Sequence, residues 1–339
     1  MAATPVLALT QGDPAGIGPE IVAKLVVGRE PAASWQPLVV AERAALEPLR
    51  AALPALDWQR LRFTSSPPSR AELEGADEVI VFDPVGEARQ LTPGLSGSAD
   101  AAGAVAALDA ALDLIDGGVA DALVTAPVAK SSIAEHLLPD FRGHTDYIAR
   151  RFGLERYGRD YLMAFLAGSL QVALVTVHQP LLAAVGGLSS EAIEAALVCL
   201  DRHAGGRIAV PGVNPHAGEG GLLGEEDRRV VAPAVARARD RGIDAHGPES
   251  PDSVFARAID GSFDWVLALY HDQGLIAVKT ASFGGSVNWT LGLPFVRTSV
   301  DHGTAFDIAG RGVADELALA QAVASTLALL DGGLPLIRD

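Results

Sequence analysis

Short apolar runs alternate along the chain with longer segments in which apolar residues recur at helical spacing. Short runs of this kind are typical of parallel strands that helices cover on both faces. The predicted strands are Val6 to Leu9, Pro37 to Val40, Glu78 to Phe82, Ala122 to Thr125, Val172 to Val177, Arg207 to Val210, Trp265 to Tyr270 and Phe295 to Thr298. Helices are predicted from Ser98 to Ile115 and from about Ser190 onwards. The pattern therefore predicts an α/β fold of parallel strands and crossover helices.

Composition excludes several classes of protein. Of the 339 residues, 49% are hydrophobic and 20% are charged, which favours a large core over disorder. The formal net charge of −16 would repel a phosphate backbone, so we expect no nucleic-acid partner. Cys199 is the only cysteine, which excludes an intrachain disulfide and a multi-cysteine metal site. It lies in an apolar run, so we expect a buried structural thiol.

The chain lacks the signals of export and of membrane insertion. Its first residues contain no basic segment and reach the polar Gln11 and Asp13 too early for a signal peptide. No uncharged apolar run approaches the roughly 18 residues that span a bilayer. We therefore expect a soluble cytoplasmic protein with no membrane partner. With no fixed repeat and no long linker, it reads as one continuous chain, with two lobes around a cleft.

Three histidines follow predicted strands, at the edge where parallel α/β sheets bind ligands. They are His178, His216 and His271. A single histidine there is more often a hydrogen-bonded loop residue, but three imidazoles together favour a catalytic divalent metal. The other histidines are weaker candidates: His203 and His246 are expected to face solvent, His136 has no assigned role, and His302 either lines the cleft or stabilises a turn.

Basic side chains in this acidic protein indicate a site for an anion. Lys279 is placed after the His271 loop, and Arg297 lies inside an otherwise apolar strand, at the end of the run Leu293-Pro294-Phe295-Val296-Arg297. A buried arginine needs an anionic partner, which is either an internal carboxylate or a substrate phosphate or carboxylate. Thr145 precedes a helix-like segment, where it either caps the helix or presents its hydroxyl to an anion.

The segment Thr10–Glu20 is a Gly/Pro-rich loop that follows the first strand and can approach a ligand closely. Pro14 and Pro19 break both the dinucleotide fingerprint and the P-loop pattern, so a nicotinamide cofactor would bind outside a Rossmann fold. From these residues alone, we expect a metal-dependent enzyme that acts on a small anionic substrate.

Nearly end to end, the sequence resembles the 4-hydroxythreonine-4-phosphate dehydrogenase family of pyridoxal 5′-phosphate biosynthesis. The motifs that carry the resemblance are Gly12-Asp13-Pro14-Ala15-Gly16-Ile17-Gly18-Pro19-Glu20, Thr125-Ala126-Pro127, Gly143-His144-Thr145, Asn214-Pro215-His216-Ala217-Gly218-Glu219, Pro251-Asp252, Tyr270-His271-Asp272-Gln273-Gly274 and the run from Val287 to Gly310. One departure is Gln179 after His178, where an aliphatic residue is common in the family.

The resemblance implies a fold like that of isocitrate and isopropylmalate dehydrogenases, with two α/β/α lobes around a cleft. The first lobe would comprise residues 1–130 and 290–339, and the second residues 131–289. The resemblance also implies a homodimer with shared active sites, NAD or NADP as cofactor, and one divalent ion (zinc, magnesium or cobalt) in each site. No cofactor-binding residue is assigned.

The resemblance also assigns roles to individual residues. The implied metal ligands are His178, His216 and His271, with His271 supplied by the partner subunit and the other two by one chain. The implied substrate contacts are His144, Thr145, Lys279, Asn288 and Arg297, with Asp252 and Asp272 lining the site. Lys279 or an aspartate would relay the hydroxyl proton.

The implied reaction is oxidation of 4-phosphooxy-L-threonine to 2-amino-3-oxo-4-phosphooxybutanoate, which decarboxylates to 3-amino-2-oxopropyl phosphate. The alternatives are a related dehydrogenase for a phosphorylated four-carbon sugar acid or an aromatic dihydrodiol carboxylate, a three-histidine metallohydrolase, and a non-catalytic anion-binding protein.

Overall fold

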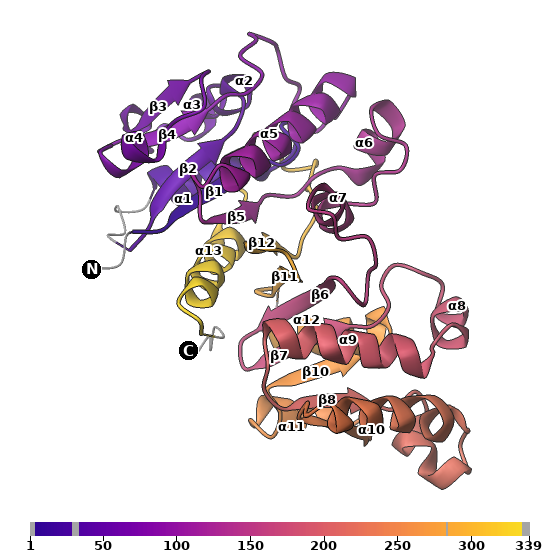
Figure 1. The fold of residues 1–339 in the computed structure, drawn as a ribbon. Helices are drawn as coiled ribbons and strands as arrows, with labels where there is room; N and C mark the ends of the chain where they lie inside the picture. Colours follow the sequence, from indigo (N-terminus) through magenta and orange to yellow (C-terminus); the bar gives the residue numbers. More distant parts are fainter. Residues whose placement is uncertain (1–3, 29–33, 283, 334–339) are drawn as a thin grey trace. The chain divides into compact units, whose positions relative to one another are not determined.

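The computed structural model describes residues 4–28, 34–282 and 284–333, and the chain divides into two compact α/β units (Figure 1). The first unit comprises Met1–Ile148 and Phe295–Leu334, and the second comprises Ala149–Pro294. Both ends of the expected first lobe, 1–3 and 334–339, lie outside the described residues. The predicted α/β class is confirmed.

The strands of the first unit are all parallel. Their order is β3 (Leu61–Thr64), β4 (Val79–Phe82), β2 (Gln36–Val40), β1 (Val6–Thr10), β5 (Ala122–Thr125) and β12 (Val296–Val300). The central strands β1 and β5 are buried along their whole length, as their continuous apolar sequences predict. All six carboxyl ends therefore meet at one edge of the sheet.

Helices connect these strands and cover them. They are α1 (Gly18–Val27), α2 (Arg43–Leu46), α3 (Leu49–Ala52), α4 (Arg70–Glu74), α5 (Ser98–Asp116), α6 (Lys130–His136), α7 (His144–Arg151) and α13 (Leu317–Leu330), with a 3₁₀ turn at Trp58–Arg60. The predicted helix from Ser98 is α5, which packs across β1, β2 and β5 (Figure 1). Helices α1 and α13 pack against each other, and α13 packs on β5 and β12.

The second unit has a mixed sheet. Its order is β11 (Val287–Leu291), β6 (Leu162–Ala167), β7 (Leu170–Leu174), β10 (Trp265–Ala268), β8 (Ile208–Pro211) and β9 (Ala245–Glu249). β6 is antiparallel to both of its neighbours, whereas β7, β10, β8 and β9 are parallel. The predicted strands of this unit, which correspond to β7, β10 and β8, are parallel as expected, whereas β6 and β11, which make the sheet mixed, were not predicted. Only Gly168 and Ser169 separate β6 from β7, and so short a connection joins only antiparallel strands.

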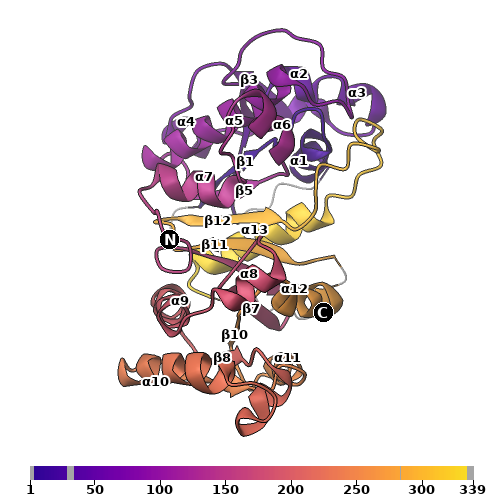
Figure 2. The same ribbon diagram turned by 90° about the vertical axis from the view of Figure 1, so that its right-hand side faces the viewer.

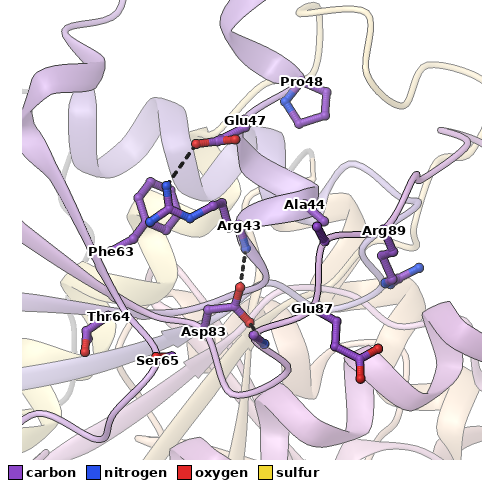
Figure 3. A pocket seen from close by; sticks show the side chains of 12 residues that line it. Arg43, Ala44, Glu47, Pro48, Phe63, Thr64, Ser65, Asp83, Glu87 and Arg89 are labelled. Carbon is purple, nitrogen blue, oxygen red and sulfur yellow. Dashed lines mark hydrogen bonds and ion pairs between the residues drawn. The ribbon is translucent and has the colours of Figure 1, made fainter.

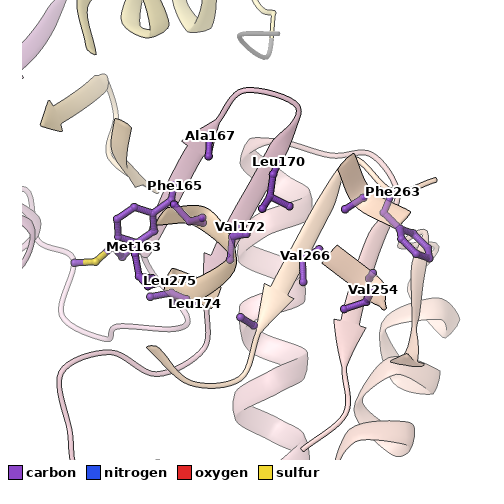
Figure 4. Close-up of a cluster of buried hydrophobic side chains, with 14 residues drawn as sticks. Met163, Phe165, Ala167, Leu170, Val172, Leu174, Val254, Phe263, Val266 and Leu275 are labelled. Atoms are coloured by element: carbon purple, nitrogen blue, oxygen red, sulfur yellow. The ribbon is translucent and has the colours of Figure 1, made fainter. Parts of the chain in front are cut away.

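Helices lie on both faces of this second sheet. They are α8 (Leu181–Gly186), α9 (Ser190–His203), α10 (Ala232–Asp240), α11 (Val254–Ile259) and α12 (His271–Ser282). Figure 2 shows α9 and α10 on one side of the strands and α11 and α12 on the other. Val172, Val266 and Leu275 belong to the core cluster between the sheet and α12 (Figure 4). No helix in the described ranges has both the length and the apolar character needed to cross a bilayer.

Candidate functional site

The three candidate metal ligands follow neighbouring parallel strands of the second unit, at one edge of the sheet. His178 follows β7, His271 follows β10 and His216 follows β8, and these strands are adjacent in the order β7-β10-β8. The predicted strands are too long, because β7 ends at Leu174 and β10 at Ala268. At the ends of these two strands, Val175 N donates a hydrogen bond to Ala268 O at 2.8 Å. The next bond between the two segments comes from a side chain, the Thr176 hydroxyl, which donates to Leu269 O.

His178 and His271 lie next to each other. Their ring centroids are 5.3 Å apart, and the ring planes are inclined by 45°. Two imidazoles that bind one tetrahedral zinc ion through nitrogen have centroids about 5 Å apart, so the pair has suitable spacing for a shared ion. His271 Nδ1 lies 2.7 Å from Asp272 Oδ1. A carboxylate only accepts, so Nδ1 donates this hydrogen bond and Nε2 remains the ring nitrogen with a lone pair, an arrangement typical of metal-binding histidines.

His216 lies in an unusual turn on the segment that follows β8. His216, Ala217, Gly218, Glu219 and Gly220 all have positive φ, with φ 52° at His216. Non-glycine residues rarely adopt this conformation, and such strain concentrates at functional sites. Within the described ranges, no group of three or more His, Cys, Asp or Glu side chains is arranged to hold a metal ion. One chain therefore brings together two of the three predicted ligands.

The aspartates that were expected to line the site accompany these histidines. His216 Nδ1 lies 3.8 Å from Asp252 Oδ2. The Ser250 hydroxyl donates to Asp252 at 2.7 Å, and this hydrogen bond, together with the nearby His216, lowers the pKa of Asp252. Asp252 and Asp272 are exposed, and each lies next to one candidate ligand.

A cluster of cations in the first unit forms a candidate anion site. Arg297 in β12 is 1% exposed, and its Nη2 donates to Thr125 Oγ1 at 2.5 Å. Burial lowers the pKa of Arg297, but a guanidinium remains charged at neutral pH. Burial, and then the charges of Arg297 and Lys130, hold the pKa of His144 well below 6.5. His144 is therefore neutral beside two cations.

Two members of this cluster, Thr125 and Lys130, are missing from the predicted site residues. Lys130 is the first residue of α6 and packs close to Gly143, where an added Cβ would lie 3.0 Å from Lys130 Cε. The available signal was the Thr125-Ala126-Pro127 motif, because Lys130 follows it by three residues.

The structure excludes one of the two roles left open for Thr145 and changes the predicted strand around Arg297. Thr145 does not cap a helix, because α7 already begins at His144 and Thr145 is buried in its first turn. The strand that carries Arg297 begins at Val296, so the apolar residues from Leu293 to Phe295 precede it.

The remaining predicted substrate contacts, Lys279 and Asn288, belong to the second unit. Lys279 does not follow a loop, because α12 begins at His271 itself and Lys279 is an exposed residue of the same helix. Asn288 lies in β11 and is half-buried, and its Oδ1 has no hydrogen-bond partner within the part of the chain that the structure describes. A polar atom buried without a partner is suited to accept a hydrogen bond from a ligand.

The glycines of the Gly/Pro-rich first loop approach the protein's own backbone. Gly12 has φ 68°, and a Cβ there would lie 2.2 Å from Pro127 O. A Cβ on Gly18 would lie 1.9 Å from Gln11 O. Asp13 is fully buried and accepts from Ser96 Oγ at 2.7 Å, and burial raises its pKa. These contacts give the loop a structural role.

The minor candidates behave largely as expected. His136, His203 and His302 are exposed, and His302 Nδ1 lies 3.0 Å from the carbonyl oxygen of Gly303. His246 is half-buried and pairs with Asp244. Cys199 is buried as predicted, and burial raises the pKa of its thiol to about 12.

A pocket of about 460 Å³ lies in the first unit, at the carboxyl ends of β2, β3 and β4 (Figure 3). Its lining includes Arg43, whose guanidinium stacks over the Phe63 ring at 4.2 Å, and Asp83, which accepts from Arg43 N at 2.9 Å. None of the predicted site residues lines this pocket.

Comparisons with known proteins agree over almost the whole chain. The family model described as "Pyridoxal phosphate biosynthetic protein PdxA" matches residues 33–326. The chain is 41% identical to a 4-hydroxythreonine-4-phosphate dehydrogenase of Burkholderia vietnamiensis, over 91% of this chain and 92% of that protein. It is 39% identical to a D-threonate 4-phosphate dehydrogenase of Bordetella bronchiseptica, over 96% and 93%. A crystal structure of 4-hydroxythreonine-4-phosphate dehydrogenase from Klebsiella pneumoniae has a TM-score of 0.81 at 35% identity, covering 96% of this chain and 99% of that chain.

Proposed function

The chain belongs to the PdxA family of pyridoxal phosphate biosynthetic proteins, and from this premise we propose that it is a metal-dependent dehydrogenase of 4-phosphooxy-L-threonine. The C3 hydroxyl is oxidised to a ketone as hydride passes to NAD or NADP and the hydroxyl proton is released. The product, 2-amino-3-oxo-4-phosphooxybutanoate, is a β-keto acid and loses CO2 to give 3-amino-2-oxopropyl phosphate. The observation that carries this proposal is the similarity to 4-hydroxythreonine-4-phosphate dehydrogenases over more than nine tenths of both chains.

The imidazoles of His178, His271 and His216 are the proposed ligands of one divalent ion. Their donor set and the 5.3 Å spacing of the first two rings fit zinc or cobalt, whereas magnesium prefers oxygen ligands. When bound, the ion would act as a Lewis acid toward the hydroxyl that is oxidised. Asp272 orients His271, and Asp252 lies beside His216.

The third ligand, His216, comes from a second copy of the chain in this proposal. We make this assignment because the rings of His178 and His271 are neighbours within one chain, whereas the resemblance assigns His271 to the partner subunit. Exposed leucines flank both half-sites: Leu182 is 89% exposed in the helix after His178, and Leu222 is 79% exposed after the His216 turn. In this proposal these leucines belong to the interface with the second chain. A homodimer with shared sites accounts for both observations.

The cation cluster of the first unit binds the negative charge of the substrate. Arg297 offers a guanidinium fork to a phosphate or carboxylate, and Lys130 adds a second charge. His144 remains neutral, so it serves as a hydrogen-bond partner, and Thr145 contributes its hydroxyl. Asn288 and Lys279 are further proposed substrate contacts, and Lys279 or an aspartate moves the hydroxyl proton. The nicotinamide supplies the hydride acceptor.

The test is a substrate panel with the purified protein. 4-Phosphooxy-L-threonine and D-threonate 4-phosphate are compared under identical conditions, each with NAD or NADP and with zinc, magnesium or cobalt, while the reduced nicotinamide is followed by absorbance. We expect the amino acid phosphate to have the higher kcat/KM and metal removal to abolish turnover. A higher kcat/KM for D-threonate 4-phosphate would reassign the substrate. Turnover that needs no nicotinamide would indicate a hydrolase.

A further inference from the structure

Hydrogen bonds connect the three segments that carry the candidate metal ligands. Thr176, two residues before His178, donates from Oγ1 to Leu269 O at 2.9 Å. Leu269 lies two residues before His271, so this bond joins the segments after β7 and β10. A second bond is needed to reach the segment after β8, which carries His216.

Gln273 provides that second connection. Its Oε1 accepts from Leu269 N at 2.8 Å, and its Nε2 donates to Gly212 O at 2.8 Å. Gly212 follows β8 and precedes the left-handed turn that carries His216. The side-chain amide therefore bridges the end of β10 and the start of the His216 turn, while its backbone lies in the first turn of α12.

Only a primary amide of this length serves both ends of the bridge. A glutamate carboxylate accepts from Leu269 N but has no proton for Gly212 O, and a methionine provides neither bond. Gln273 is half-buried, so loss of the bonds leaves backbone groups poorly satisfied. The bridge acts on backbone that is already unfavourable, because His216 and its neighbours have positive φ.

We propose that Gln273 is a positioning residue that holds the His216 turn and the His178–His271 pair at a fixed separation in each chain. This inference rests on the proposed metal function of the histidines. The hydrogen bonds of Thr176, Leu269, Gln273 and Gly212 connect the three segments that carry the proposed ligands. This holds within each copy of the protein, whichever copies share an ion. Loss of the bridge would therefore weaken metal binding without removing a ligand.

The test compares Gln273→Met with Gln171→Met. Gln171 lies at the amino end of β7 in the same unit, is buried, and likewise donates its side-chain amide to a backbone carbonyl, Gly168 O, at 3.0 Å. Both substitutions remove an amide that bonds the backbone, but only one affects the histidine segments. Affinity for Co²⁺ is measured by titration of the full-length metal-free protein, and the visible spectrum of bound Co²⁺ reports ligand geometry.

We expect Gln273→Met to bind Co²⁺ about tenfold more weakly or worse, with an altered spectrum, and Gln171→Met to match the unmodified protein. Equal affinity and an unchanged spectrum in Gln273→Met would overturn the proposal. An equal loss in both variants would also overturn it, because a general destabilisation of the unit would then suffice.

Hydrogen exchange of the metal-free protein tests the bridge without any metal. Residues 212–221 should exchange faster in Gln273→Met and in Gln273→Glu, whereas the Leu269 amide should exchange faster only in Gln273→Met. Unchanged exchange in both variants would contradict the bridge. If the unmodified protein binds no Co²⁺, the proposed metal function fails, and the exchange result still decides whether Gln273 holds the His216 turn.

Discussion

Replacing Arg297 by lysine should weaken substrate binding while keeping the positive charge. Arg297 is 1% exposed, and its Nη2 already donates to Thr125 Oγ1, so the guanidinium is held in place before an anion arrives. A lysine ammonium lacks the planar fork that pairs with two oxygens of a phosphate or carboxylate. Loss of one charge-assisted hydrogen bond costs about 1 to 3 kcal/mol, or about a 5- to 150-fold rise in the dissociation constant.

The assay is calorimetric titration of 4-phosphooxy-L-threonine, with steady-state kinetics on the same preparation. Arg62→Lys is the matched control, because Arg62 is an exposed residue of β3 whose partner is Glu78, at 3.4 Å. We expect the control to bind substrate normally. If Arg297→Lys lowers the melting temperature but leaves both the dissociation constant and KM unchanged, Arg297 is an internal brace and our assignment is wrong.

Three further predictions concern the first unit. The pKa of His144 is depressed, so its contribution to stability is complete above pH 6.5 and declines as the pH falls. Between pH 7 and 5, the unfolding free energy of the unmodified protein should therefore fall more steeply than that of His144→Gln, by at most about 1.4 kcal/mol per pH unit. Parallel curves of unfolding free energy against pH would contradict this prediction. Gly18→Ala should lower the melting temperature sharply, because the added Cβ would lie 1.9 Å from Gln11 O. Gly186→Ala should leave the melting temperature unchanged, because a Cβ at Gly186 meets open space. Lys130→Gln should raise KM by a smaller factor than Arg297→Lys does, and equal KM values in Lys130→Gln and the unmodified protein would remove Lys130 from the anion site.

The strand pattern was predictable where strands are buried on both faces. The predicted strand from Ala122 to Thr125 coincides with β5. The strand predicted from Val6 to Leu9 is β1, which is one residue longer and ends at Thr10. β9 and β11 are missing from the predicted strands because their sequences, AHGPE and VNWTL, contain polar residues or proline. β6 has the same continuous apolar sequence as the predicted strands, so no physical difference explains why it is missing from the prediction.

The candidate site was predictable only at the level of the sheet edge. Strand order brings His178, His216 and His271 to the carboxyl ends of neighbouring parallel strands, as expected. The contact between the rings of His178 and His271 depends on finer features, among them the start of α12 at His271, and His216 lies in a run of positive φ angles. No apolar periodicity encodes either feature.

The central claim is a metal site built from two chains, with His178 and His271 from one and His216 from the other. It predicts which inactive variants restore each other when mixed. His216→Ala mixed with either His178→Ala or His271→Ala should recover activity. Random reassortment makes half of the dimers mixed, each with one intact site of two, so recovery should approach about a quarter of the unmodified activity.

The decisive measurement is the mixture of His178→Ala with His271→Ala, with subunit exchange verified by differently tagged chains. Both of these ligands belong to the same half-site in our account, so every site in a mixed dimer lacks one of them and activity should stay at background. Recovery to about a quarter in this mixture would show that His271 acts in the partner's site and would contradict the account.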